Sequence, residues 1–280
     1  MTAYSSTRRK FLKTAGVGLL ALGLLSSAWS QSDSSSTGSS FMFVQLCDPQ
    51  LGMGGYEQDL QSFEKAVRQI NLLNPAFVVI CGDLVQHANE QSFADFNRIK
   101  AELQVPCYCV AGNHDVGNVP TAESLENYRQ KIGADTYSFE HGPFTFVGVN
   151  TQFWTLESEE SDRQAAWLEQ TLATAAEKKS PVIVIGHYPL FLKTADEADQ
   201  YFNIPFVQRQ KILALFEKYG VVAMLGGHTH KLIMNEYKGI QLVNGETTSK
   251  NFDDRPFGYR VWTVTDSRPI QHEFIPLEGL

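Results

Sequence analysis

The sequence predicts an α/β domain with parallel strands, followed by a smaller antiparallel part near its end. Between residues 41 and 225, short apolar runs alternate with segments whose apolar residues recur at helical spacing. Repeated strand, helix, strand order favours parallel pairing through crossover helices. Residues 232–276 contain four short strand-like runs, which add antiparallel pairing. Because no internal repeat or second linker interrupts this pattern, residues 41–280 are predicted to form one domain.

The first half of the domain holds three expected strands, at residues 41–47, 76–81 and 107–110. A helix is expected around residues 57–73, where apolar side chains fall on one helical face. A second helix is expected near residues 90–103. Each expected strand in this half therefore precedes or follows a helix, as parallel pairing requires.

The second half begins with an expected helix at residues 121–131. Residues 136–140 and 144–150 are then typical of a hairpin that turns at His141-Gly142-Pro143. A helix at residues 165–176 precedes a strand at 182–185. Residues 205–219 predict another helix, since Asn203 stands near its start and Gly220 just past its end, and a strand follows at 221–225.

The first thirty residues predict a cleavable signal peptide. Arg8, Arg9, Lys10 and Lys13 precede an apolar stretch at residues 15–25, and Ala28-Trp29-Ser30 offers the small residues of a cleavage site. The stretch falls short of the about 20 apolar residues that a membrane span needs, so no stable span is expected after cleavage. An uncleaved N-terminal anchor is the alternative. Residues 31–40 are serine-rich and predict a flexible linker.

The adjacent arginines of this leader resemble those of a twin-arginine signal. The resemblance implies recognition by the twin-arginine export machinery and export of an already folded protein to the periplasm. Such a route suits an enzyme that takes up its metal before it crosses a membrane.

Without the leader, the chain is strongly acidic. Removal of its four basic residues leaves 19 basic and 31 acidic residues, a formal net charge of −12. This balance argues against nucleic acid as the primary ligand, because nucleic-acid sites need clustered positive charge. A phosphate site in such a chain needs a local source of positive charge, which metal ions can supply.

The four cysteines predict buried free thiols. Cys47, Cys81, Cys107 and Cys109 each lie in an apolar, strand-like run, and none shows the two-residue spacing of a zinc site. A disulfide between Cys107 and Cys109 would be strained, since both point to one face of a strand. A bridge between Cys47 and Cys81 remains an alternative if their strands are neighbours.

Five polar clusters begin where expected strands end. In open α/β sheets, the carboxyl ends of the strands form the binding crevice, so these clusters are expected to meet at one edge. Each cluster alone has an ordinary interpretation, because an Asp after a strand often caps a helix and a lone His is often structural. The clusters are Cys47-Asp48-Pro49-Gln50, Gly82-Asp83, Gly112-Asn113-His114-Asp115, Gly186-His187-Tyr188 and Gly226-Gly227-His228-Thr229-His230.

In the same order, these motifs resemble those of the calcineurin-like metallophosphoesterases, over nearly all of residues 41–280. The fold implied is a four-layer α/β/β/α sandwich with mixed sheets. The resemblance is closer to the branch described as serine/threonine protein phosphatases. The runs that carry it are Asp48-Pro49-Gln50, residues 112–118, residues 187–191 and Asn150-Thr151-Gln152-Phe153.

The resemblance implies a two-metal centre. Asp83 would bridge both metals, Asp48, Gln50 and His230 would complete one site, and Asn113, His187 and His228 the other. A set of oxygen and nitrogen ligands suits Mn, Fe, Zn or Mg. The wider family usually has His in place of Gln50, and this harder amide ligand favours Mn or Fe, unless Gln50 only holds a metal-bound water.

The implied activity is hydrolysis of a phosphate monoester, including that of a phosphoprotein, by a hydroxide activated between the metals. His114 would protonate the leaving group as general acid, with Asp115 holding its orientation. A role for His114 in binding phosphate is the alternative. Two other activities stay open for the domain: a phosphodiesterase or pyrophosphatase acting on nucleotides or lipid precursors, and a non-catalytic metal-binding scaffold.

Several other residues are weaker candidates. Asn150 and Gln152 either touch substrate or satisfy a turn. Arg255, beside Asp254, either grips a second anionic group or belongs to a solvent-facing loop. Tyr188 and Phe191 line the pocket wall or belong to the core. The remaining histidines fit no motif and are expected to be surface or structural residues: His87, His141 and His272.

Overall fold

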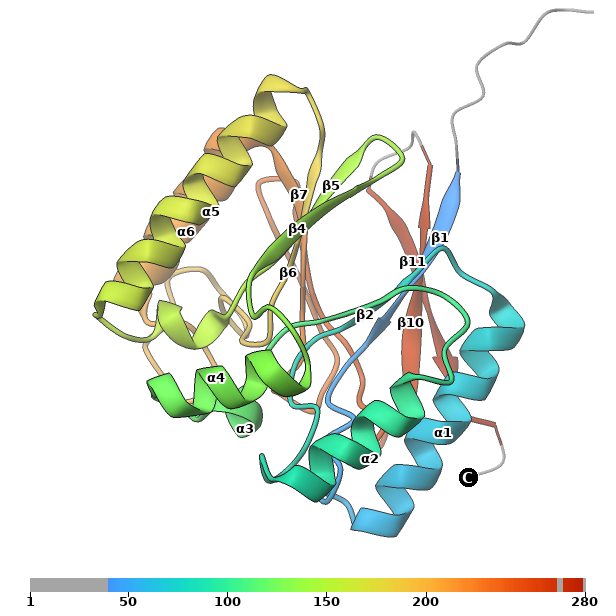
Figure 1. The fold of residues 1–280 in the computed structure, drawn as a ribbon. Helices are drawn as coiled ribbons and strands as arrows, with labels where there is room; N and C mark the ends of the chain where they lie inside the picture. The colour runs from blue at the N-terminus through green and yellow to red at the C-terminus, as the bar shows by residue number, and fades with distance from the viewer. Residues whose placement is uncertain (1–39, 266–268, 279–280) are drawn as a thin grey trace, which may run out of the picture. The chain divides into compact units, whose positions relative to one another are not determined.

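Two mixed β-sheets form the centre of the fold in the computed structural model, which describes residues 40–265 and 269–278 (Figure 1). The predicted signal peptide and nearly all of the predicted linker lie outside these residues. In the described part of the chain, no helix has the length and hydropathy of a membrane span.

The first sheet has five strands. β1 (Phe41–Leu46), β2 (Val78–Ile80) and β3 (Cys107–Cys109) pair in parallel, and β10 (Gly258–Val264) and β11 (Gln271–Pro276) extend the sheet antiparallel on the other side of β1. The parallel strands come from the predicted strand–helix–strand segment, and β10 and β11 come from the predicted antiparallel end.

The second sheet has six strands in the order β4-β5-β6-β7-β9-β8. Its four inner strands run parallel, and they are β5 (Phe144–Gly148), β6 (Val182–Ile185), β7 (Val221–Gly226) and β9 (Ile240–Asn244). β4 (Tyr137–His141) and β8 (Ile233–Tyr237) pair antiparallel at the edges. The β4–β5 hairpin turns at Gly142, as predicted.

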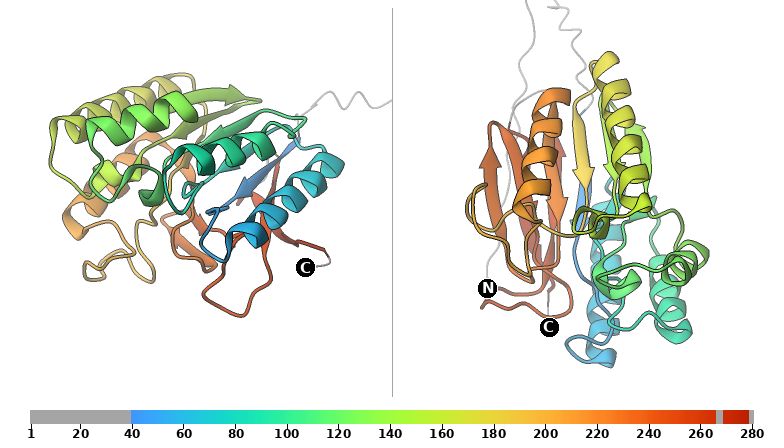
Figure 2. Two further views of the ribbon diagram at one scale, coloured as in Figure 1. Left: turned by 60° about the horizontal axis from the view of Figure 1, so that its bottom comes forward. Right: turned by 90° about the vertical axis from the view of Figure 1, so that its left-hand side faces the viewer.

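Helices cover the outer face of each sheet, and the two sheets pack on each other (Figures 1 and 2). α1 (Tyr56–Leu73) and α2 (Glu90–Lys100) share an apolar cluster with the first sheet, and α5 (Glu159–Glu177) and α6 (Phe206–Tyr219) share one with the second. A third cluster fills the layer between the sheets. This arrangement confirms the predicted four-layer α/β/β/α sandwich.

Strand alternation explains how each sheet buries both faces. In the β2 segment, Val78 and Ile80 join the cluster under the helices, whereas Phe77 and Val79 join the cluster between the sheets. Successive side chains of a strand point to opposite faces, so an uninterrupted apolar run is what a strand between two layers needs.

Two helix starts differ from the prediction. α5 begins at Glu159 rather than at residue 165, because the Ser158 hydroxyl caps it by accepting a hydrogen bond from the Ser161 N–H. Its polar first turns show no apolar periodicity, which hid them in the sequence. α6 begins after Pro205, and Asp199 rather than Asn203 accepts a hydrogen bond from its first N–H, that of Phe206.

Two short elements were not predicted: α3 (Asn113–Val116) and the 3-10 helix η1 (Thr151–Trp154). The helix expected at 121–131 is α4 (Ala122–Lys131). The four cysteines are free thiols, as predicted, with Cys47, Cys81 and Cys109 buried.

Candidate metal centre

All seven predicted metal-ligand residues meet at one edge of the two sheets. Asp48 and Gln50 follow β1, Asp83 follows β2 and Asn113 opens α3 after β3, while His187 follows β6 and His228 and His230 follow β7. These are the carboxyl ends of parallel strands, where a binding crevice is expected. All seven residues are less than a tenth exposed. Burial of so many ionisable groups is costly unless they are paired or coordinate a metal.

Two groups of ligand atoms lie close enough to hold one metal ion each. Asp83, His187 and His228 form one group, and Asp48, Asp83 and His230 form the other, with the ligand atoms of each group within 4.8 Å of one another. Asp83 belongs to both groups. Asp83 is therefore the residue that would contribute to both groups if each held an ion.

His187 is held with one nitrogen directed at the other candidate ligands. Its Nδ1 lies 2.8 Å from the carbonyl oxygen of Cys81, which accepts the Nδ1 proton. Its Nε2 then lies 3.1 Å from Asn113 Oδ1 and 3.2 Å from Asp83 Oδ2. Histidine ligands are typically fixed by such a hydrogen bond to the second ring nitrogen. His230 is held in the same way, by the carbonyl of Lys250 on its Nδ1.

Two buried atoms at the site have no hydrogen-bond partner: Gln50 Oε1 and His228 Nε2. The Gln50 amide is fixed because its Nε2 donates to Gln86 Oε1 at 2.9 Å. An unpaired buried acceptor costs about 1–3 kcal/mol. A cation at the site would satisfy both atoms, so the residues present fit a bound metal.

The backbone is strained where these ligands stand. Asp48, Gln50, Asp83, His228 and His230 all adopt positive φ, between 31° and 69°. Residues other than glycine rarely adopt this conformation, at a cost of about 1–3 kcal/mol each, and such strain concentrates at functional sites.

Glycines let these loops approach one another closely. A Cβ at Gly112 would lie 2.1 Å from Asp83 Oδ1, and one at Gly227 would lie 2.5 Å from Asp48 Oδ2. The two aspartates therefore pack against backbone with no room for a side chain, which fixes their carboxylates.

The electrostatics of the protein groups at the site reflect competition between burial and charge. Burial raises the pKa of Asp48 to about 6, although His230 and His187 act against the shift. Burial also opposes ionisation of Asp83, but His187, with smaller contributions from His114 and His228, holds the pKa of Asp83 below its usual range.

Among the histidines, burial acts against the charged form of His187, but Asp83 and Asp48 outweigh it and raise its pKa to about 9. Burial and the neighbouring His187 lower the pKa of His228 well below its ordinary value. Without metal, the site therefore holds a proton on His187, close to Asp83.

His114 and Asp115 do not form the predicted pair. The Asp115 carboxylate accepts hydrogen bonds from the N–H groups of Leu84, Val85 and Gly112 instead. The imidazole of His114 is oriented by the carbonyl of Gln86, 3.1 Å from its Nδ1. Consecutive residues of a helix point in different directions, and both residues lie in α3, so neighbours in sequence cannot face each other.

Asn150 and Gln152 are fully buried and lie in the turn at the start of η1. Asn150 caps η1 by accepting from the Gln152 N–H, and its backbone N–H and carbonyl bond the Gln164 side chain. Of this run, Thr151 reaches the site, since its hydroxyl accepts from the N–H of Tyr188 at 3.0 Å.

Of the other weaker candidates, Tyr188 lies at the site, whereas Phe191 and Arg255 do not. The ring of Tyr188 lies 4.1 Å from that of His228, centroid to centroid, and its hydroxyl donates to Asn118. Phe191 belongs to the core. Arg255 stands on an exposed loop and pairs with the buried Glu246.

The three remaining histidines take no part in either ligand group. His87 is exposed, His141 packs edge-on against Phe41, and His272 lies against Trp262. Burial, with Arg260 nearby, lowers the pKa of His272 to about 4.

Three residues that support the site were not predicted as site residues: Thr151, Gln86 and Ser249. The Gln86 side chain holds Gln50, its carbonyl holds His114, and Ser249 donates to the carbonyl of Asp48. Gln86 follows Asp83 in the same loop, and Thr151 belongs to the run Asn150-Thr151-Gln152-Phe153. Their places beside predicted motifs could therefore have identified both. Ser249 comes from a distant loop, and nothing in its local sequence marks it.

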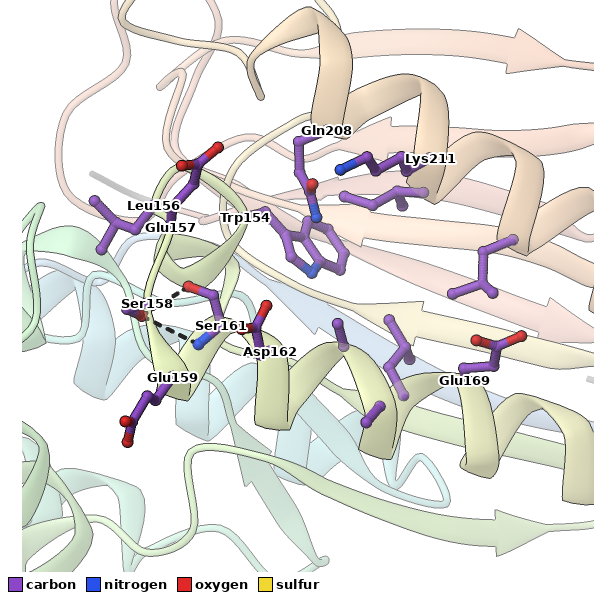
Figure 3. Close-up of a pocket in the computed structure, with 15 residues that line it drawn as sticks. Trp154, Leu156, Glu157, Ser158, Glu159, Ser161, Asp162, Glu169, Gln208 and Lys211 are labelled. Atoms are coloured by element: carbon purple, nitrogen blue, oxygen red, sulfur yellow. Dashed lines mark hydrogen bonds between the residues drawn. The ribbon is translucent and has the colours of Figure 1, made fainter.

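A separate groove in the described structure lies away from these strand ends. It measures about 720 Å³ and runs between α5 and α6, with Trp154, Glu169 and Lys211 among its lining residues (Figure 3). None of the predicted metal ligands lines it. The candidate metal ligands therefore lie at the strand ends and not in this groove.

Comparisons with known proteins agree with this geometry. Residues 42–232 match the family described as calcineurin-like phosphoesterases. The chain is 35% identical to the serine/threonine-protein phosphatase CPPED1 of Rattus norvegicus over 267 residues, which cover 86% of this chain and 85% of the rat protein.

Two solved structures share the fold. A dimetal phosphatase from Danio rerio superposes with a TM-score of 0.66 at 14% identity, covering 85% of this chain and 99% of that one. GAP50 of Plasmodium, described as the anchor in the inner membrane complex, superposes with a TM-score of 0.60 at 17% identity, covering 85% of each chain.

Proposed function

The chain belongs to the calcineurin-like phosphoesterase family and is a hydrolase of phosphoric esters, and from that premise we propose that it cleaves phosphate monoesters at a two-metal centre. A phosphoprotein is one such substrate, and the name of the rat relative supports it. The site residues proposed are the seven ligands together with His114.

The observation that carries the proposal is the position of Asp83. It shares one ligand group with His187 and His228 and a second with Asp48 and His230. Two cations held by one carboxylate lie close together, and paired metals about 3.5–4 Å apart are typical of phosphatases. When bound, the metals would neutralise the phosphoryl oxygens and activate a water as nucleophile.

The chain's own residues would bind and orient the reacting groups. Asp83 is kept anionic by the histidines around it, so it is ready to bind cations at neutral pH. The backbone N–H groups of His114 and His228 donate to Asp83 and Asp48 respectively and fix the carboxylates. Such hydrogen bonds orient ligands before any metal arrives.

His114 is positioned to act as general acid. Its Nδ1 faces the Gln86 carbonyl, which only accepts, so Nδ1 carries a proton. In the imidazolium form, Nε2 carries the second proton, and it is this proton that would pass to the leaving oxygen. General acids of this kind contribute about 10²–10⁴-fold to the rate. The imidazole is partly exposed and lines a surface pocket, so a substrate can reach it.

Mn or Fe is the metal that this ligand set favours. Gln50 offers a neutral amide oxygen, whose buried Oε1 has no other partner. Oxygen ligands suit Mn and Mg, and imidazole suits Fe and Zn. A site with both kinds of ligand therefore favours Mn or Fe.

One experiment tests the proposed function. The purified full chain is reconstituted with Mn²⁺, its bound metal is counted, and its activity is measured on p-nitrophenyl phosphate, the bis-ester, phosphopeptides and nucleotides. We expect two metals per chain and higher kcat/KM on the monoesters. A single metal per chain contradicts the two-metal centre, and a preference for the bis-ester favours a phosphodiesterase.

We also propose that the chain is exported to the periplasm through the twin-arginine machinery. The support is the leader with Arg8 and Arg9, and an acidic remainder that contains no expected membrane span. Replacing both arginines by lysine is expected to retain the chain in the cytoplasm on fractionation. Unchanged export of that variant contradicts the proposed route.

A further inference from the structure

A second hollow, of about 540 Å³, opens beside the candidate metal centre. Asn113, His114, Val119 and Tyr201 are among the residues that line it. A leaving group that His114 protonates must lie next to His114, so this hollow is where that part of a substrate would be found.

Tyr201 reaches this hollow from a distant segment, residues 192–205, between β6 and α6. Its ring centroid lies 5.3 Å from that of His228 and 5.0 Å from that of Phe202. Tyr201 as a whole is nevertheless 59% exposed, so much of the residue remains open to a ligand.

Two charged side chains hold the segment that carries Tyr201: the half-buried Glu197 and the buried Arg209. The Glu197 carboxylate accepts from the N–H groups of Leu192, Lys193 and Thr194. The fully buried guanidinium of Arg209 donates to the carbonyls of Ala195, Glu197 and Ile204. The position of Tyr201 is therefore built into the fold, and its ordering costs little when a ligand binds.

The charge of the hollow limits what it can accept. Its described lining contains no Lys or Arg, and its one carboxylate, that of Asp115, is buried and bonded to backbone N–H groups. A second phosphate or a carboxylate on the leaving group would meet no Lys or Arg side chain here. An uncharged group with a flat face would meet the Tyr201 ring and Val119.

We infer that this hollow binds the leaving group of the substrate and that it selects an uncharged aromatic one, packed against Tyr201. In its simplest form the substrate is an aryl phosphate, the phosphate ester of a phenol. This inference rests on the proposed phosphomonoesterase activity, and it adds Tyr201 as the residue that determines specificity.

The test compares an aromatic with a non-aromatic leaving group. Tyr201→Ala is expected to lower kcat/KM for phenyl phosphate about three- to tenfold, the value of one aromatic contact. The loss of kcat/KM for glycerol 2-phosphate should be at least about threefold smaller than that for phenyl phosphate, and Tyr201→Phe, which keeps the ring, should show no such difference between the two substrates. Val207→Ala, exposed on the first turn of α6, is the matched control and should change neither substrate.

An equal loss on both substrates, or no loss on either, overturns the inference. Asp83→Ala, assayed in parallel, separates this failure from that of the proposed function. If Asp83→Ala is inactive while Tyr201→Ala equals wild type, only the aromatic subsite is wrong. If Asp83→Ala retains full activity, the metal mechanism itself fails.

A charge reversal tests the second half of the inference. Wild type should prefer phenyl phosphate to 4-carboxyphenyl phosphate. Val119→Lys, at a position 65% exposed, should shift that preference at least about threefold toward the carboxylated substrate. A wild type that prefers the carboxylated substrate contradicts selection for an uncharged group.

Discussion

The two sheets contribute different chemistry to one site. The first sheet supplies oxygen ligands from the ends of β1, β2 and β3, and the second supplies nitrogen ligands from the ends of β6 and β7. The oxygen ligands are Asp48, Gln50, Asp83 and Asn113, and the nitrogen ligands are His187, His228 and His230. Each candidate metal group draws on both sheets, so neither sheet holds a complete site alone.

The layer between the two sheets also has chemically different contacts at its two ends. Near the amino ends of the parallel strands, the contacts are aromatic, with Phe43 stacked on Phe77 and edge-on to Phe146. At the carboxyl ends, the contacts are polar and carry the ligands. The aromatic end joins the sheets by apolar burial, whereas the polar end is joined by charge and depends on what is bound there.

The largest loss of metal and activity is expected from removal of the ligand that both metal groups share. Asp83→Ala deletes the carboxylate common to both groups, so we expect both metals to be lost and kcat/KM to fall by about 10³-fold or more. Metal content and initial rates measure the two effects. Asp135→Asn, a buried aspartate paired with Arg129 away from the site, is the control and should keep two metals. Retention of both metals by Asp83→Ala would show that the carboxylate is not shared.

A nitrogen ligand placed among the oxygen ligands should change the metal preference of the site. Gln50→His is expected to raise the affinity for Zn²⁺ relative to Mn²⁺ by about 10-fold or more, because imidazole is the better ligand for zinc. Competition between the two metals, followed by activity and metal analysis, measures the ratio. Gln50→Glu is a useful second variant, since a harder anionic oxygen should shift the ratio the other way. An unchanged ratio in both variants would mean that Gln50 does not contact metal.

A smaller loss is expected from the residue that supports Gln50. Gln86→Ala removes the acceptor of the Gln50 Nε2 proton but leaves the carbonyl that orients His114. Metal affinity at one site should weaken about tenfold, as for other partners of metal ligands. The kcat at saturating metal should stay near that of wild type. A large fall in kcat with unchanged metal affinity would place Gln86 in the reaction itself.

In protein prepared without metal, thermal stability should depend on pH through His187, one of the nitrogen ligands. The pKa of His187 is raised from its ordinary 6.5 to about 9, so its stabilising contribution is complete below about pH 6.5 and is lost as pH rises through 9. The Tm of the metal-free chain should therefore fall by on the order of 5 °C between pH 6.5 and 9. The Mn²⁺-bound chain should show no such fall, because metal replaces the proton.

His187→Gln serves as the comparison for this effect, since it removes the titrating group. Its metal-free Tm should vary less over the same range, as thermal unfolding at several pH values would measure. A wild-type Tm that does not change between pH 6.5 and 9 contradicts the assignment of the proton to His187.

Local patterns predicted the α/β class and the five polar clusters, whereas the four layers and the assignment of metal ligands followed from the resemblance to the family. Apolar runs marked the strands, and polar clusters beside glycines marked where the strands end. The sequence did not predict the partner of His114, because adjacency to Asp115 in sequence suggested a contact that a helical turn prevents. It also did not predict Tyr201 or Ser249, since both reach the site from loops that are distant in the chain and carry no motif.

The left-handed backbone of five ligand positions has a consequence for engineering. A designer who copied the seven side chains onto regular strand ends of another α/β scaffold would reproduce the chemistry but not the angles from which it is presented. Asp48, Asp83 and His230 would then point away from a common centre. Transplanting this site would require the loops, with the glycines that let Asp48 and Asp83 pack closely, as the smallest movable unit.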